Sequence, residues 1–146
     1  MQFRLRTLFL AVMIVAGIAL GVKNAMQNIE DTQSTFAARL VANMCVSHME
    51  ANHQQWPANW EDLRDDFEPC LARSGESWEF DDLENRVEVN WNADPWILTA
   101  QQDNPNAEAP QLIWVRSDDE VKFYGTSPEW IILNYLKSQT KPVAIP

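Results

Sequence analysis

The pattern of apolar and polar positions changes sharply after residue 22. Residues 7–22 read TLFLAVMIVAGIALGV and include no charged side chain. As a helix this run measures about 24 Å. The hydrocarbon core of a bilayer is about 30 Å thick, and the long side chains of Arg4 and Arg6 reach from a slightly buried backbone to the headgroups. The pattern predicts a transmembrane anchor over residues 1–23.

Charges around this segment predict its orientation. Arg4, Arg6 and the amino terminus precede it, whereas only Lys23 follows directly. The positive-inside rule then places the N-terminus in the cytoplasm and the rest of this single-pass membrane protein outside it. A cleaved signal peptide is the alternative, because residues 19–21, Ala-Leu-Gly, have the small-x-small form of a cleavage site. We favour retention, since the helical pattern continues beyond this site.

Residues 24–53 have the pattern of an amphipathic helix. The segment contains no proline and no glycine, and its apolar residues recur at steps of three and four. Phe36, Leu40 and Met44 fall on one stripe, and Arg39 falls on the polar face. We expect one long helix whose inner half lies in the membrane and whose outer half packs on the domain.

The rest of the chain predicts short elements. Runs of alternating or β-branched residues predict antiparallel strands at residues 87–91, 112–116 and 121–124. Short helices are expected at residues 59–67, where Pro69 ends the helix, at 81–85 and at 129–137, where Trp130 is buried. The predicted fold class is α+β, with an anchor at 1–23, an extracytoplasmic domain at 24–137 and a loose tail at 138–146.

Acidic residues dominate the domain, and their charge excludes some classes of binding partner. Without Arg4, Arg6 and Lys23, the remaining chain has 8 basic and 21 acidic residues, a net charge of −13. A surface of this sign repels phosphate backbones and anionic headgroups. Nucleic-acid binding is therefore not expected, and the acidic domain is expected to be highly soluble.

Two cysteines, Cys45 and Cys70, are candidates for a disulfide, because an even pair outside the cytoplasm suggests one. Two separate buried thiols are the alternative. With His48 and His53 they could also supply four zinc ligands. The spacing C-x2-H-x4-H matches no common zinc module, so we expect no metal and no cofactor.

Tryptophan is abundant, with 7 residues in 146. Those inside predicted strands and helices are expected in the core: Trp91, Trp114 and Trp130. Those near turns are candidates for a binding surface, because exposed tryptophans stack on sugars and anchor partners: Trp56, Trp60 and Trp96. Catalytic motifs for nucleophiles, phosphates or dinucleotides do not occur, so no enzymatic activity is expected. A hydrolase based on paired carboxylates is a weak alternative.

Two features resemble known families. Residues 55–63, QWPANWEDL, are similar to the W/Y-P-x-S-x-x-D-L stretch that often follows the long helix of pseudopilins, and the expected architecture resembles type IV pilins. The opening FRLRTL at residues 3–8 is similar to the F-x-L-R-T-L opening of a group of uncharacterised bacterial single-span membrane proteins. The resemblance implies a non-enzymatic, membrane-anchored, pilin-like protein that acts through protein–protein contacts. A carbohydrate- or cell-wall-binding module that uses the turn tryptophans is the alternative.

Overall fold

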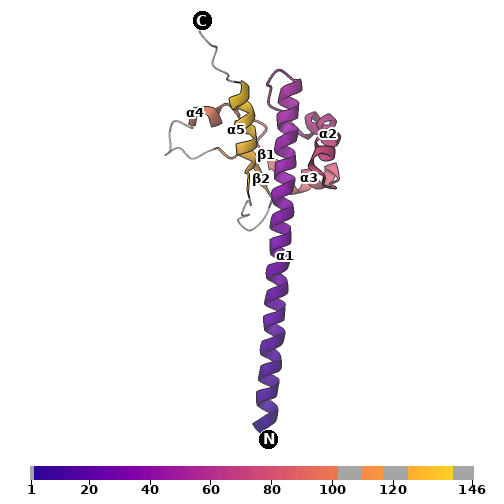
Figure 1. Ribbon diagram of the computed structural model, residues 1–146, viewed down its shortest axis with the longest axis vertical. Helices are drawn as coiled ribbons and strands as arrows, with labels where there is room; N and C mark the ends of the chain where they lie inside the picture. Colours follow the sequence, from indigo (N-terminus) through magenta and orange to yellow (C-terminus); the bar gives the residue numbers. More distant parts are fainter. Residues whose placement is uncertain (1, 102–109, 117–124, 140–146) are drawn as a thin grey trace.

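A single continuous helix, α1 (Gln2–Ala51), runs through most of the length of the molecule (Figure 1). The fold is seen in a computed structural model that describes residues 2–101, 110–116 and 125–139. No helix breaker interrupts α1 after Gly21. The helix ends at Ala51, and His53 and Gln54 then take positive φ angles of 53° and 67°, which turn the chain back along the domain.

The outer half of α1 forms the centre of the core. Helices α2 (Arg64–Ser74) and α3 (Phe80–Arg86) lie on one side of it, and α5 (Pro128–Gln139) lies on the other (Figure 1). Because neighbours cover several sides, buried residues occur around most of its circumference: Ala37, Ala38, Leu40, Val41, Ala42, Met44, Cys45 and Met49. The predicted packing of this half on the domain is confirmed.

Two residues of the predicted amphipathic helix, one on its apolar stripe and one on its polar face, behave differently from the expectation. Leu40 and Met44 are buried, but Phe36 is 41% exposed because the domain ends near this level of the helix. Arg39 was assigned to a free polar face and is instead half-buried, with its Nε donating to the carbonyl oxygen of Thr126 at 2.7 Å. The domain wraps further around α1 than a single amphipathic stripe predicts.

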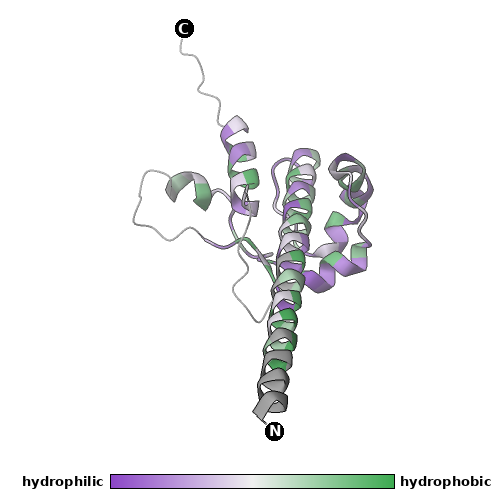
Figure 2. Cartoon of the chain, turned by 60° about the horizontal axis from the view of Figure 1, so that its bottom comes forward, coloured by the Kyte–Doolittle hydropathy of each residue, from purple (hydrophilic) through white to green (hydrophobic). Residues whose placement is uncertain are grey.

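The inner half of α1 leaves the domain as a rod (Figure 2). Its large described apolar side chains between Val12 and Ile29 are more than half exposed, and the described part of this rod is coloured mainly as hydrophobic in this view. Among the residues that the structure describes, no helix is both long and apolar enough to cross a bilayer.

The first turn of the chain after α1 leads into the 3-10 helix η1 (Trp60–Leu63) and directly into α2. Asn59 caps η1 by accepting a hydrogen bond from the Asp62 amide at 3.3 Å. The expectation that Pro69 ends this helix is wrong: Pro69 lies inside α2, which continues to Ser74 and ends at Gly75 with a φ of 72°. Pro69 is exposed, whereas Cys70 beside it is buried against α1, so packing overcomes the helix-breaking tendency of proline.

The sheet joins β1 (Val87–Val89) and β2 (Ile113–Val115) as antiparallel neighbours. Glu88 lies opposite Trp114, and one face of each strand contributes to the core. The predicted α+β class and these two strands are confirmed. The third expected strand, residues 121–124, lies outside the described residues, as do residues 140–146 of the expected tail.

Helix α4 (Ile97–Gln101) contacts α5, and α5 runs parallel to α1. The parallel direction follows from two contacts: Thr126 lies beside Arg39, and the Gln54 side chain donates to Gln139 at 3.4 Å. The face of α5 turned to the core carries Pro128, Ile132, Tyr135 and Leu136.

The expectation that Trp130 lies in the core is wrong. It is 57% exposed, whereas Ile132 on the same helix is fully buried. The run WIILNYL offers apolar residues on every side of α5, so its pattern does not reveal which side faces inward.

Candidate functional site

Trp56 and Trp60 are two of the three tryptophans proposed for a binding surface. Each of them contacts the turn that follows β1. The indole nitrogen of Trp56 donates to the carbonyl oxygen of Asn90 at 3.0 Å. The ring of Trp60 lies 5.5 Å from that of Trp91 and 5.9 Å from that of Phe80, both edge-to-face. Both side chains are half-buried against the core, so they hold η1 onto the domain.

The third, Trp96, starts the turn into α4 and is also half-buried. Its amide donates to the Asp94 carboxylate at 3.0 Å. The most exposed tryptophan of the described residues is Trp130, which the sequence pattern placed in the core. Its neighbours in the heptapeptide WIILNYL gave no signal that would have singled it out.

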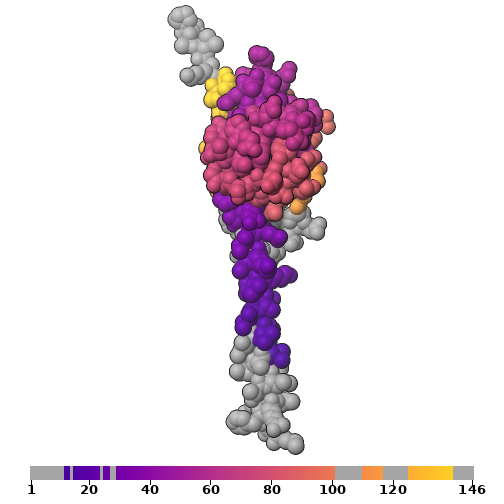
Figure 3. All heavy atoms as spheres, turned by 90° about the vertical axis from the view of Figure 1, so that its right-hand side faces the viewer, coloured from indigo at the N-terminus to yellow at the C-terminus, as the bar shows by residue number. Residues whose placement is uncertain are grey.

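The elements η1, α2 and α3 form the face of the domain that lies away from α5 (Figure 3). Most of the exposed charged side chains of these elements are acidic, and we call this surface the acidic face. A shallow groove of about 350 Å³ on it is lined by three acids, two aromatic rings and one arginine: Glu68, Glu79, Asp81, Phe67, Phe80 and Arg64. The Arg64 guanidinium lies 4.6 Å from the centre of the Phe80 ring. The face therefore presents aromatic rings beside carboxylates. The Arg64 guanidinium of the same face stacks on the Phe80 ring in a cation–π contact.

A polar cluster joins α1 to the start of α2. The Nδ1 atom of His48 lies 3.0 Å from the carbonyl oxygen of Asp62 and 3.6 Å from a carboxylate oxygen of Asp66. Burial raises the pKa of Asp66, while a hydrogen bond from Ser47 and the nearby His48 ring partly oppose this rise. His48 is thus a half-buried residue on the face of α1 that contacts the start of α2.

Cys45 and Cys70 both lie in the seam between α1 and α2, and both are buried, free thiols in this structure. Burial raises the pKa of the Cys45 thiol far above its usual range, and the negative charge of Asp66 adds to this effect. Cys70 differs in its surroundings, because an Arg73 nitrogen lies 3.1 Å from its sulfur. The disulfide between the two cysteines stays a prediction.

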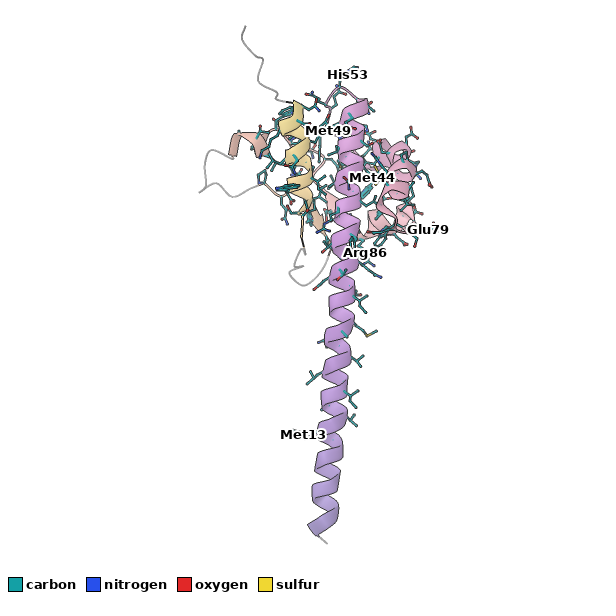
Figure 4. All side chains as sticks on the ribbon, in the orientation of Figure 1. Met13, Met44, Met49, His53, Glu79 and Arg86 are labelled. Carbon is teal, nitrogen blue, oxygen red and sulfur yellow. The ribbon has the colours of Figure 1, made fainter. Side chains whose placement is uncertain are left out.

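The four residues considered as zinc ligands are not gathered in one place. His53 lies at the exposed turn at the end of α1, beyond Met49 (Figure 4), while the two cysteines are in the core. Within the described parts of the chain, no three histidine, cysteine or acidic side chains are grouped so that they could hold a metal ion.

Comparison with known proteins found no match: no protein-family model, curated protein or solved structure is similar to this chain.

Proposed function

We propose that this protein is a single-pass membrane protein, with its N-terminus in the cytoplasm, whose extracytoplasmic domain acts through protein–protein contacts. The observation that carries the proposal is the division of α1 into two halves. Residues 34–49 are central to the core of the domain, while the described apolar residues from Val12 to Ile29 point outward without cover. A bilayer would cover the uncharged run of residues 7–22 within this rod.

A helix shared by anchor and domain fixes the position of the domain. From Lys23 to Ser34 the helix rises about 16 Å. Because no break separates the two halves, the domain would stand rigidly at about this height above the membrane surface. A long helix that carries a small domain on its outer half is also the arrangement of pilin-like proteins, and it is the part of that resemblance that supports the proposal.

The charge of the domain supports proteins as its partners. The face formed by η1, α2 and α3 exposes carboxylates, including Glu79 and Asp81 beside the Phe80 ring. Nucleic acids and anionic lipids would be repelled from it. A protein with basic residues would be attracted, and such complementarity mainly sets the specificity and rate of association.

The anchor is tested by two lysine substitutions on one helix. Val15 and Ile29 are 67% and 59% exposed in the structure, but only Val15 lies near the centre of the uncharged run of residues 7–22. A lysine near the centre of a span costs about 2.5–3.5 kcal/mol of insertion free energy. Val15→Lys should therefore release a substantial fraction of the protein from membranes during carbonate extraction, and Ile29→Lys should leave it in the pellet.

Two results would contradict the anchor. One is a soluble wild-type product that begins near Val22, which would identify a cleaved signal peptide. The other is equal extraction of the two variants.

The protein contacts are tested by charge reversal on the acidic face. Like charges brought together across an interface cost several kcal/mol, so the double variant Glu79→Lys, Asp81→Lys should lower recovery of any co-purifying protein from solubilised membranes by more than about tenfold. Glu30→Lys, an exposed acid on α1 below the domain, is the matched control. Recovery of no second protein with the wild type, or equal recovery with both variants, would refute contacts through this face.

A further inference from the structure

One of the two histidines of the chain lies in the seam between α1 and the segment formed by η1 and α2. The Nδ1 atom of His48 lies 3.0 Å from the carbonyl oxygen of Asp62 and 3.6 Å from a carboxylate oxygen of Asp66. The side chains of His48 and Asp66 are only 14% and 17% exposed. The seam therefore contains a titratable pair that is largely shielded from solvent, with one member from α1 and the other from α2.

Two oxygen atoms face the same ring nitrogen of His48, and this determines where the neutral ring carries its hydrogen. A neutral imidazole has one N–H group and one acceptor nitrogen. Nδ1 carries the hydrogen and donates it to the Asp62 carbonyl oxygen, so Nε2 is the atom that takes up a second proton. The side-chain amide of Asn52 lies 3.2 Å from Nδ1 but has its own acceptor, the His48 carbonyl oxygen at 2.9 Å.

Uptake of a proton by His48 changes the seam because of the Asp66 carboxylate. Burial makes the charged form of this carboxylate costly and raises its pKa, and a hydrogen bond from Ser47 and the His48 ring oppose the rise. A protonated ring at 3.6 Å converts the contact into an ion pair. Because the pair is shielded, its attraction is stronger than that of a pair in open water. The neutral ring supplies no such charge.

The neighbouring acids increase the need for a cation at this seam. Asp65, the residue before Asp66 in α2, adds negative charge beside it. The Asp62 carboxylate accepts a hydrogen bond from the Ala58 amide at 2.7 Å, which is a neutral donor. Neither acid therefore compensates the charge of Asp66.

The remaining titratable groups of the seam do not take the place of a protonated histidine. Burial raises the pKa of the Cys45 thiol far above its usual range, so this group stays neutral. The Arg73 guanidinium contacts the Cys70 sulfur and the Ser47 hydroxyl. His48 is thus the group through which proton uptake can bring a positive charge to Asp66.

We propose that the His48–Asp66 pair is a pH-sensitive contact, which attaches the η1–α2 segment more firmly to α1 when His48 is protonated than when it is neutral. A proton that binds more tightly to the folded state adds stability below the range in which histidine side chains ordinarily titrate, about pH 6.5, and this stability is lost as the pH rises through that range. Asp66 acts in the same direction, because a raised carboxyl pKa also makes proton binding favour the folded state.

The seam is internal to the domain, so this inference goes beyond the proposed function and does not depend on it. Its consequence for the molecule is that η1 and α2, which form part of the acidic face, are attached more firmly in mildly acidic than in alkaline surroundings.

The first test is His48→Gln, because glutamine retains a hydrogen-bond donor for the Asp62 carbonyl but cannot become charged. Urea unfolding of the full chain in detergent compares the variant with the wild type at about pH 5.5 and about pH 8, on either side of the histidine range. His48→Gln should lower the unfolding midpoint by about 0.5 M more urea at the lower pH than at the higher one, as expected for a partly buried ion pair.

His53→Gln is the matched control, because His53 is the other histidine of the chain and lies at the exposed turn after α1. Its effect on the midpoint should be the same at both pH values. Comparison with the wild type at each pH also removes the general effect of the many acids. An effect of His48→Gln that does not change with pH would overturn the proposal.

Asp66→Asn tests whether the carboxylate is the partner of the protonated ring. Asparagine preserves the size of the side chain and an acceptor oxygen but removes the charge. In an Asp66→Asn background, His48→Gln should lower the midpoint equally at the two pH values. A difference between the two pH values that persists in this background would refute the pairing.

Amide hydrogen exchange of the wild-type protein gives an answer that requires no variant to fold. Exchange rates are corrected for the intrinsic effect of pH, and α5, on the other side of α1, is the internal reference (Figure 1). Protection of the α2 amides relative to those of α5 should fall about fivefold between about pH 5.5 and about pH 8. A constant ratio would contradict a pH-sensitive seam.

Discussion

Replacing Met44 by alanine should lower the free energy of unfolding by about 2–5 kcal/mol, as large-to-small changes in cores do. Met44 is fully buried in the outer half of α1, between α5 on one side and α2 on the other (Figure 4). Methionine and alanine are both good helix formers, so the loss would come from packing and not from the helix itself. Urea unfolding of the full chain in detergent, followed by near-ultraviolet circular dichroism, measures it.

Gln33→Ala is the matched control for Met44→Ala, because Gln33 lies on the same helix and is exposed. Surface changes of this kind stay within about 0.5 kcal/mol. The contrast decides whether α1 is part of the fold or a stalk that only holds the domain away from the bilayer. Equal midpoints for the two variants would identify a stalk, and the rigid attachment proposed above would fail with it.

The long helix was predictable because its signals are local. The absence of proline and glycine between Lys23 and Ala51 and the steps of three and four among apolar residues depend only on neighbours in the sequence. The strands Val87–Val89 and Ile113–Val115 were found for the same reason, since each lies within a run of alternating or β-branched residues.

The errors occurred where tertiary contacts decide. Trp130 and Ile132 are both apolar and only two positions apart, and it is the direction in which α5 packs on α1 that exposes the first and buries the second. Pro69 was expected to end a helix that continues because Cys70 packs against α1. Arg39 was assigned to the surface because the contact with Thr126 spans 87 residues of sequence.

The candidate sites were predictable to a smaller extent than the fold. The sequence indicated that Cys45 and Cys70 could approach each other, and both do lie in one seam. It contained no sign of Arg73 at the Cys70 sulfur, because an arginine three positions from a cysteine on a helix is ordinary. Proximity to turns suggested exposure for Trp56 and Trp60, but a turn that packs on another turn buries its aromatic residues in part.

The role of the turn tryptophans can be decided by comparing Trp60 with Trp130. Trp60 is packed edge-to-face against both Trp91 and Phe80, and Phe80 in turn lies 5.4 Å from the Phe67 ring of α2. Trp60→Ala would remove the ring that connects η1 to this cluster. We expect it to lower the free energy of unfolding by about 3 kcal/mol, the lower end of the range for truncating large aromatic residues in cores, because Trp60 is half-buried.

Trp130→Ala removes the same side chain from a site where it is 57% exposed, and it should cost less than about 0.5 kcal/mol. Urea unfolding of both variants in one detergent gives the comparison directly. If Trp60 belonged to a carbohydrate-binding surface and not to the packing of the domain, its removal would leave stability close to that of the wild type. The two variants would then unfold at the same urea concentration, and the structural assignment of Trp60 would be wrong.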